Sequence, residues 1–125
     1  MASILGDCLK ISGLVASGDL SAVQWQPVKA ASTAGAVVAC SAVTDAVLGI
    51  LVNDPTSGQP AEIVCAGNTK AKFAASVTYG AKLTPNSTGY LKVSSSANDQ
   101  VVGIALEAST TAGEIHPMFV VRSNF

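Results

Sequence analysis

The chain has 125 residues, which is enough for one domain with its own core, and its 49% hydrophobic residues against 12% charged ones exclude a disordered chain. The net charge is −1 and no basic stripe is present, so the sequence argues against nucleic-acid binding. No apolar stretch is long enough to span a bilayer, and the first residues lack the pattern of a signal peptide.

The first 26 residues contain apolar pairs but no heptad and little regular alternation. This segment is either an extra strand of the same domain or an arm that orders on a neighbouring subunit. At its end lies Trp25, the only tryptophan, which we expect at the edge of the core rather than in a ligand pocket.

From residue 27 onward, short runs rich in Val, Ile and Ala alternate with clusters of Gly, Ser, Thr, Asn, Asp and Pro, which is typical of an all-β domain. Alanine favours helix over strand, so a short helix within residues 38–47 is an alternative. The predicted strands cover residues 28–31, 36–40, 47–52, 61–66, 71–75, 81–83, 90–93, 101–106 and 116–122.

Two parts of this domain, residues 27–66 and 81–121, match at a constant offset of 54 positions. The identical pairs are Gly35 and Gly89, Ser41 and Ser95, Asp45 and Asp99, Val47 and Val101, Gly49 and Gly103, Ile50 and Ile104, and Thr56 and Thr110. Any small all-β chain repeats strand–turn patterns to some extent, but the register favours an internal repeat.

The repeat predicts the architecture. A four-stranded unit has edges and a face that it cannot bury alone, whereas two packed units can close a small β-barrel or sandwich. Residues 1–26 would add an arm or an extra strand to the β-domain of residues 27–125. Gly49 and Gly103 each interrupt an apolar strand, which indicates a bulge, a bend or a close backbone approach.

The residues needed for catalysis or metal binding are not grouped along the chain. His116 is the only histidine, no nucleophile elbow accompanies it, and we expect it to be a structural or surface residue. The three cysteines are far apart and fit buried free thiols in a reducing compartment, and the acidic residues form no calcium loop. We therefore predict a protein that is not an enzyme and carries no cofactor or metal.

Lipoyl and biotinyl carrier domains are also small duplicated β-barrels, and they carry a modified lysine on an exposed hairpin between the halves. Lys70 and Lys72 lie near the middle of this chain, in "NTKAKF", but the residues that usually flank such a lysine are missing. A carrier domain therefore stays a lesser alternative.

Four stretches, "QWQPVKAA", "AVLGIL", "YGAKLTPNSTGYLKV" and "VVGIALEA", give residues 24–121 a familiar layout. This layout resembles the capsid cement, or head decoration, proteins of tailed bacteriophages. That family often opens with a charged, proline-containing segment, whereas the N-terminus here is apolar.

The resemblance implies a structural virion protein that is made in the host cytoplasm and binds the major capsid protein on the outside of the assembled head. It also implies a homotrimer, with no role for nucleic acid or membrane. The apolar residues Ile4, Leu5, Leu9 and Ile11 are the predicted capsid contact, because they lie outside the repeat. Another virion role, as a minor coat, tail or head-completion protein, shares these features.

Overall fold

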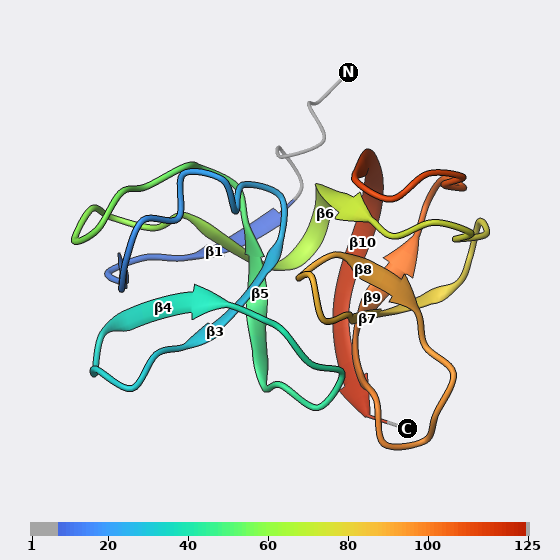
Figure 1. Ribbon diagram of the computed structural model, residues 1–125, viewed down its shortest axis with the longest axis horizontal. Coiled ribbons are helices and arrows are strands. Elements are labelled where there is room, and N and C mark those ends of the chain that lie inside the picture. The colour runs from blue at the N-terminus through green and yellow to red at the C-terminus, as the bar shows by residue number, and fades with distance from the viewer. Residues whose placement is uncertain (1–7, 125) are drawn as a thin grey trace.

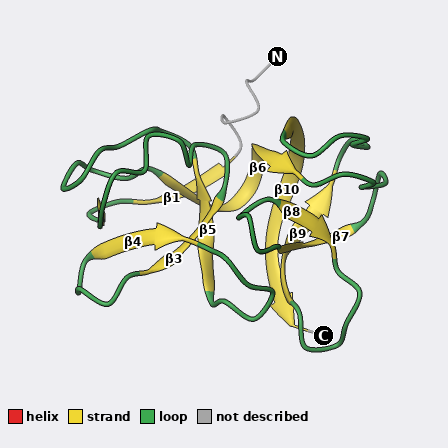
Figure 2. Ribbon diagram, viewed as in Figure 1, coloured by secondary structure: helices red, strands yellow, loops and turns green. Residues whose placement is uncertain are grey.

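The computed structural model describes residues 8–124, and over this range the chain is built of β-strands without a helix (Figures 1 and 2). This confirms the predicted all-β class. The alternative of a short helix within residues 38–47 is wrong, because that segment is a strand end followed by a turn. The strands are β1 (Cys8–Ile11), β2 (Val15–Ala16), β3 (Pro27–Ala30), β4 (Ala36–Ala39), β5 (Val47–Leu51), β6 (Ile63–Phe73), β7 (Lys82–Pro85), β8 (Leu91–Val93), β9 (Gln100–Ala105) and β10 (Glu114–Asn124).

Five strands close into a small barrel in the order β6, β8, β7, β9 and β10, and β10 returns to pair with β6. The β6–β8 contact is parallel and the others are antiparallel. Closure satisfies both edges of every strand in the ring, which removes the exposed edges that a flat sheet would present. The predicted barrel is therefore confirmed, and it forms the right-hand half of Figure 1.

The remaining strands lie outside this ring and continue from the first part of β6. Their pairings, β5 with β6, β3 with β5 and β3 with β4, follow the order of β9 with β10, β7 with β9 and β7 with β8 in the barrel. β2 runs parallel to β4, as the end of β6 runs parallel to β8. β1 and β2 are thus extra strands of this same chain, while residues 1–7 lie outside the described residues.

β6 differs from the sequence prediction, which placed two strands at residues 61–66 and 71–75 with a turn between them. The structure has one strand of 11 residues, about 36 Å long at the usual rise. Gly67 within it has a φ of 97°, so the chain changes direction there without leaving the sheet. The first part of β6 pairs with β1 and β5, and the second part pairs with β10 and β8.

Two apolar clusters form the core, and β6 contributes to both. Neighbouring residues Ile63 and Val64 are fully buried, the first in the smaller cluster around Val28 and the second in the larger cluster. The larger cluster fills the barrel, with Phe73 and Met118 among its largest members, and extends to Val47 and Ile50 of β5 outside the ring. Because consecutive residues of a strand face opposite sides, β6 is the wall that the two clusters share.

The same turn precedes β5 and β9. The Asp45 carboxylate accepts a hydrogen bond from the backbone N–H of Ser41 at 2.8 Å, and the Asp99 carboxylate accepts one from Ser95 at 3.0 Å. Each carboxylate also accepts the N–H of the next residue. The matched pairs Ser41 and Ser95, and Asp45 and Asp99, therefore make equivalent hydrogen bonds.

The glycines of the apolar strands lie where another strand comes close. A Cβ on Gly103 would overlap the Phe119 carbonyl oxygen of β10, and one on Gly49 would overlap the carbonyl oxygen of Val64 in β6. Both positions are therefore close backbone approaches, one of the three explanations that the sequence left open. The other matched glycines, Gly35 and Gly89, have φ values of 82° and 87°, which a turn can demand of glycine at little cost.

Candidate functional site

A row of exposed apolar side chains runs along β10 of the barrel. Ile115, Phe119 and Val121 are 45%, 42% and 43% exposed, and Pro117 alternates with them on the same face. The intervening Met118 is fully buried inside the barrel. We call the four outward residues the β10 stripe. A row of large exposed apolar side chains on the outer face of a strand is a candidate contact surface.

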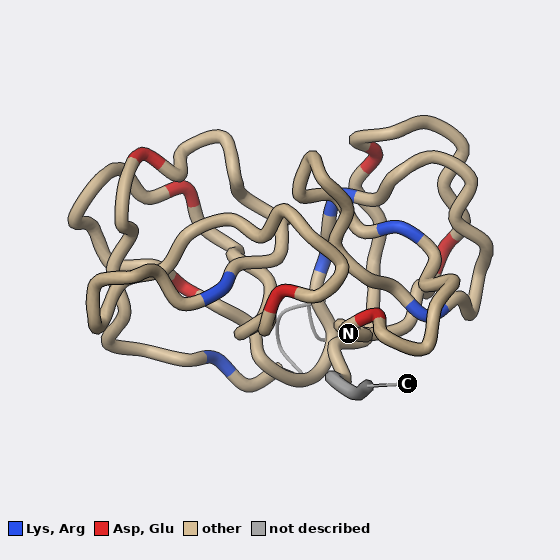
Figure 3. Tube along the Cα trace, turned by 60° about the horizontal axis from the view of Figure 1, so that its bottom comes forward, with Lys and Arg blue, Asp and Glu red and all other residues tan. Residues whose placement is uncertain are grey.

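Basic residues of β6 border the stripe. Pro117 pairs with Lys70 and Ile115 pairs with Lys72, while on the other side Phe119 pairs with Ile104 of β9. The Lys72 ammonium donates a hydrogen bond to the Ala22 carbonyl at 3.3 Å. Elsewhere the charged residues of the described chain are spread over both halves without a cluster of one sign (Figure 3). The stripe is therefore an apolar surface with a weakly basic edge.

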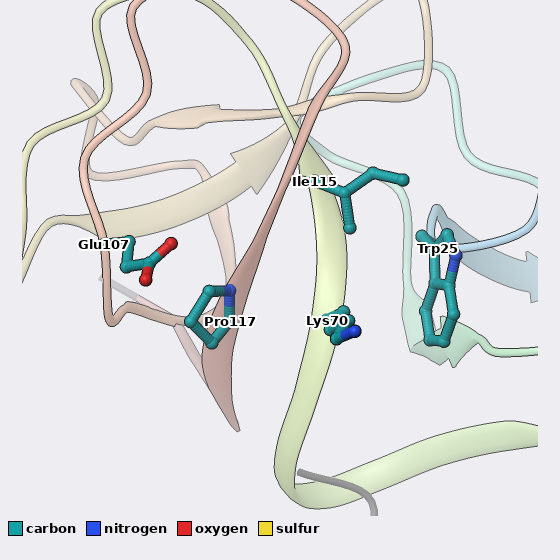
Figure 4. Close-up of a pocket in the computed structure, with 5 residues that line it drawn as sticks. All are labelled: Trp25, Lys70, Glu107, Ile115 and Pro117. Carbon is teal, nitrogen blue, oxygen red and sulfur yellow. The ribbon is translucent and has the colours of Figure 1, made fainter.

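At the Ile115 end, the stripe runs into a pocket of about 560 Å³ (Figure 4). Its lining comes from four separate segments of the chain. Trp25 and Lys70 lie on one side and Glu107 and Pro117 on the other, with Ile115 above them in Figure 4. The pocket thus combines an indole, two apolar side chains and one charged group of each sign.

Trp25 has an unusual backbone, with a φ of 71°. A bulky residue in this left-handed region costs about 1–3 kcal/mol and persists only where the surroundings enforce it. Here the Trp25 N–H donates to the Leu51 carbonyl at 2.6 Å, and the Trp25 carbonyl accepts the Lys72 N–H at 2.7 Å. Its half-buried side chain packs against the larger core cluster, as the sequence predicted, but it also lines the pocket.

Glu107 is held in place by the only histidine. His116 Nδ1 lies 2.7 Å from Glu107 Oε1, and its Nε2 lies 2.7 Å from Glu114 Oε1. These bonds to Glu114 and then Glu107 raise the pKa of His116. The bond from His116, with further bonds from the 110–111 turn, lowers the pKa of Glu114 to about 2. The imidazole of His116 therefore bridges two carboxylates, which favour its protonated form.

The predicted capsid contacts are only partly described. Leu9 is 64% exposed on β1, where it pairs with Ala66 of β6, while Ile11 is half buried against the smaller core cluster. Ile4 and Leu5 lie outside the described residues. Of the two predicted contact residues that lie in β1, Leu9 is thus available to a partner, whereas Ile11 mainly packs against the core.

The residues considered for other chemistry are dispersed. Among residues 8–124 no three His, Cys, Asp or Glu side chains gather as a metal site. Cys40 is buried, but Cys8 and Cys65 are half buried, so the prediction of buried thiols is wrong for two of the three. The candidate carrier residues Lys70 and Lys72 lie in the second part of β6 and pair with β10, not on an exposed hairpin.

Sequence reasoning missed both the stripe and the pocket. The stripe had a signal, because "PMFVV" is apolar at both the inward and the outward positions of a strand. A one-sided strand would alternate apolar with polar residues. The pocket had no such signal, since its residues are up to 92 positions apart, from Trp25 to Pro117.

Comparison with known proteins adds a structural likeness. No family model matches the chain, and no curated protein matches its sequence. The fold is similar to a crystal structure of the head fibre gp8.5 N base of bacteriophage phi29, with a TM-score of 0.69. The similarity covers 94% of this chain and 98% of the other at 15% sequence identity, so it shows a shared fold.

Proposed function

We propose that this chain is a non-enzymatic structural protein of a phage virion that binds the outer surface of the assembled head and stabilises it. The observation that carries the proposal is the fold shared over nearly the whole chain with the base of a phage head fibre. The motifs in residues 24–121 support it independently, because they resemble head decoration proteins.

The contact with the major capsid protein would use the β10 stripe together with the N-terminal segment. Phe119 and Val121 provide exposed apolar area on the stripe. Leu9 of β1 adds further exposed apolar area, and Ile4 and Leu5 precede it in the sequence. Apolar contact is proportional to buried area and depends little on salt. Attachment through these residues therefore predicts binding that survives high ionic strength.

Stabilisation follows from differential affinity. A protein that binds the expanded lattice and not the unexpanded one shifts the equilibrium toward the expanded form. A homotrimer at the positions where three capsid subunits meet would add avidity, since each contact raises the effective concentration for the next. The related halves, residues 27–66 and 81–121, would descend from a duplication that supplied both parts of the fold.

The test is co-sedimentation of the purified protein with expanded, empty capsids and with unexpanded procapsids, at low and at high salt. The proposal expects saturable binding to the expanded form alone, with little loss at high salt. Binding to neither form would overturn the decoration role and favour a tail or head-completion position.

Two variants locate the contact. Phe119→Ser removes apolar area from the stripe, and deletion of residues 2–7 removes Ile4 and Leu5 but keeps β1, which pairs with β6. Tyr79→Ser is the matched control, because Tyr79 is 75% exposed and lies outside the stripe. Both test variants should lose affinity while the control binds as wild type does. Unchanged binding by both would refute this contact surface.

A further inference from the structure

The pocket beside the stripe has features that capsid attachment does not require. Trp25 has a backbone conformation that glycine would adopt more easily, and its indole lines the pocket as well as packing on the core. His116 aims the Glu107 carboxylate and leaves its second oxygen, Oε2, outside the bond to the imidazole. Strained and deliberately oriented side chains that share one cavity point to a ligand.

The charges of the pocket restrict the class of ligand. The exposed Lys70 ammonium is in none of the ion pairs found among the described residues, and Glu107 faces the pocket from the other side. An anion would be attracted by Lys70 but repelled by Glu107, and a cation the reverse. A neutral molecule rich in hydroxyl groups satisfies both, because a hydroxyl donates to a carboxylate and accepts from an ammonium.

The apolar walls of the pocket restrict the class of ligand further. The flat indole of Trp25 suits a ring with an apolar face, and Ile115 and Pro117 offer a surface to a small methyl group. A pyranose sugar has an apolar face of C–H groups and a rim of hydroxyls, and an N-acetyl substituent adds the methyl.

We propose that the pocket formed by Trp25, Lys70, Glu107, Ile115 and Pro117 binds a neutral sugar ring, with an N-acetylated hexose as the preferred ligand. The indole stacks on the ring, Glu107 and Lys70 bind its hydroxyls, and the acetamido methyl packs on Ile115 and Pro117. The pocket shares Ile115 and Pro117 with the stripe, whereas Trp25, Lys70 and Glu107 are not part of the proposed capsid contact, so the sugar site goes beyond that attachment.

The protein carries its own reporter, since Trp25 is the only tryptophan. Titration of the full chain with N-acetylglucosamine should change the tryptophan fluorescence saturably, with a dissociation constant in the millimolar range that is usual for one sugar ring. Glucose should bind more weakly. Glucosamine and glucuronic acid, which are charged, should bind weakest. No saturable change with N-acetylglucosamine, or stronger binding of either charged sugar, would overturn the proposal.

Exposed residues give variants that should fold. Glu107→Gln can still bond to His116 and should weaken N-acetylglucosamine binding at least fivefold, while glucuronic acid binding improves because the repulsion is gone. Lys70→Met should weaken N-acetylglucosamine binding and favour glucosamine in the same way. Tyr79→Ser is again the control. If neither charge substitution changes the order of the sugars, the assignment of Glu107 and Lys70 is wrong.

The indole is tested by calorimetry, because its replacement removes the fluorescence. Trp25→Gly relieves the left-handed φ and should abolish sugar binding, with a thermal melt to verify folding. Each pocket variant is also tested for capsid binding, where Glu107→Gln and Lys70→Met should behave as wild type. Loss of sugar binding with normal capsid binding separates this site from the proposed function, and sugar binding by a folded Trp25→Gly variant would overturn the stacking role.

Discussion

The close approach of β9 to β10 makes a strong prediction about Gly103. In Gly103→Ala the new methyl group would overlap the Phe119 carbonyl oxygen and come within 2.6 Å of Met118 Cε. The methionine end could move, but the carbonyl belongs to the backbone of a barrel strand. Relief therefore requires β10 to shift away from β9, where Gly103 and Val120 are paired.

The size of the effect follows from this geometry. Adding a methyl to a well-packed interior costs about 1–3 kcal/mol, and a clash with backbone belongs at the upper end, about 3 kcal/mol. The entropy of unfolding for 125 residues is roughly 0.26 kcal/mol per kelvin, so the melting temperature should fall by about 11 °C. Urea unfolding followed by fluorescence or circular dichroism gives the free energy directly.

Two matched substitutions make the experiment decisive. Gly49→Ala meets the Val64 carbonyl in the same manner and should cost a similar amount. Gly18→Ala has nothing within 4 Å of the new methyl, and its free energy of unfolding should stay within about 0.5 kcal/mol of wild type. If Gly103→Ala were as stable as Gly18→Ala, β9 and β10 would not approach as closely as described, and the reasoning would fail.

Three further predictions concern titratable groups. Glu114 and Glu107 raise the pKa of His116, so the protonated imidazole stabilises the fold fully below the ordinary pKa of 6.5, and this stabilisation is lost as pH rises through the raised pKa. Urea unfolding should therefore show a lower free energy of unfolding at about pH 9 than at pH 6. The variant His116→Gln should remove this difference. Burial acts to raise the pKa of the Asp45 carboxyl, but the hydrogen bonds from Ser41 and Lys29 outweigh burial and lower this pKa. Asp45→Ala should therefore cost about 1–2 kcal/mol of stability near pH 7. An unchanged midpoint of thermal denaturation would contradict the role of this turn. Burial raises the pKa of the Cys40 thiol to about 12, so a thiol reagent should modify Cys40 only in urea, and mass spectrometry of the native, treated protein should find it unmodified.

Much of the fold could be predicted because it depends on local patterns. Short Val-rich and Ile-rich runs between turn residues predict strands, and eight of the ten observed strands overlap predicted ones. β6 was predicted as two strands because "AGNTK" has the composition of a turn. In the structure, Gly67 takes its positive φ within the strand, and pairing with β10 on one edge overrides the weak strand preference of Gly67 and Asn68.

The candidate site depended on contacts that local patterns do not contain. Nothing near Trp25 in the sequence indicates Glu107, because the barrel brings the β9–β10 loop toward the segment before β3. His116 was predicted to be a structural or surface residue, and its two carboxylate partners could not be identified from spacing alone. The left-handed φ of Trp25 is likewise imposed by β5 and β6 through hydrogen bonds.

The shared strand β6 has a consequence for how this molecule can be divided. It is the last strand of the first half and a member of the closed ring of the second half, with one core cluster on each side. Cleavage of the chain at any one position therefore cannot separate the two halves so that each keeps all the strands that enclose its core. A protease that nicks β6 should melt both halves together, and a tag or fusion partner belongs in a surface loop such as residues 56–58 rather than at the midpoint of the chain. The two segments that match in the sequence therefore form a single cooperative folding unit.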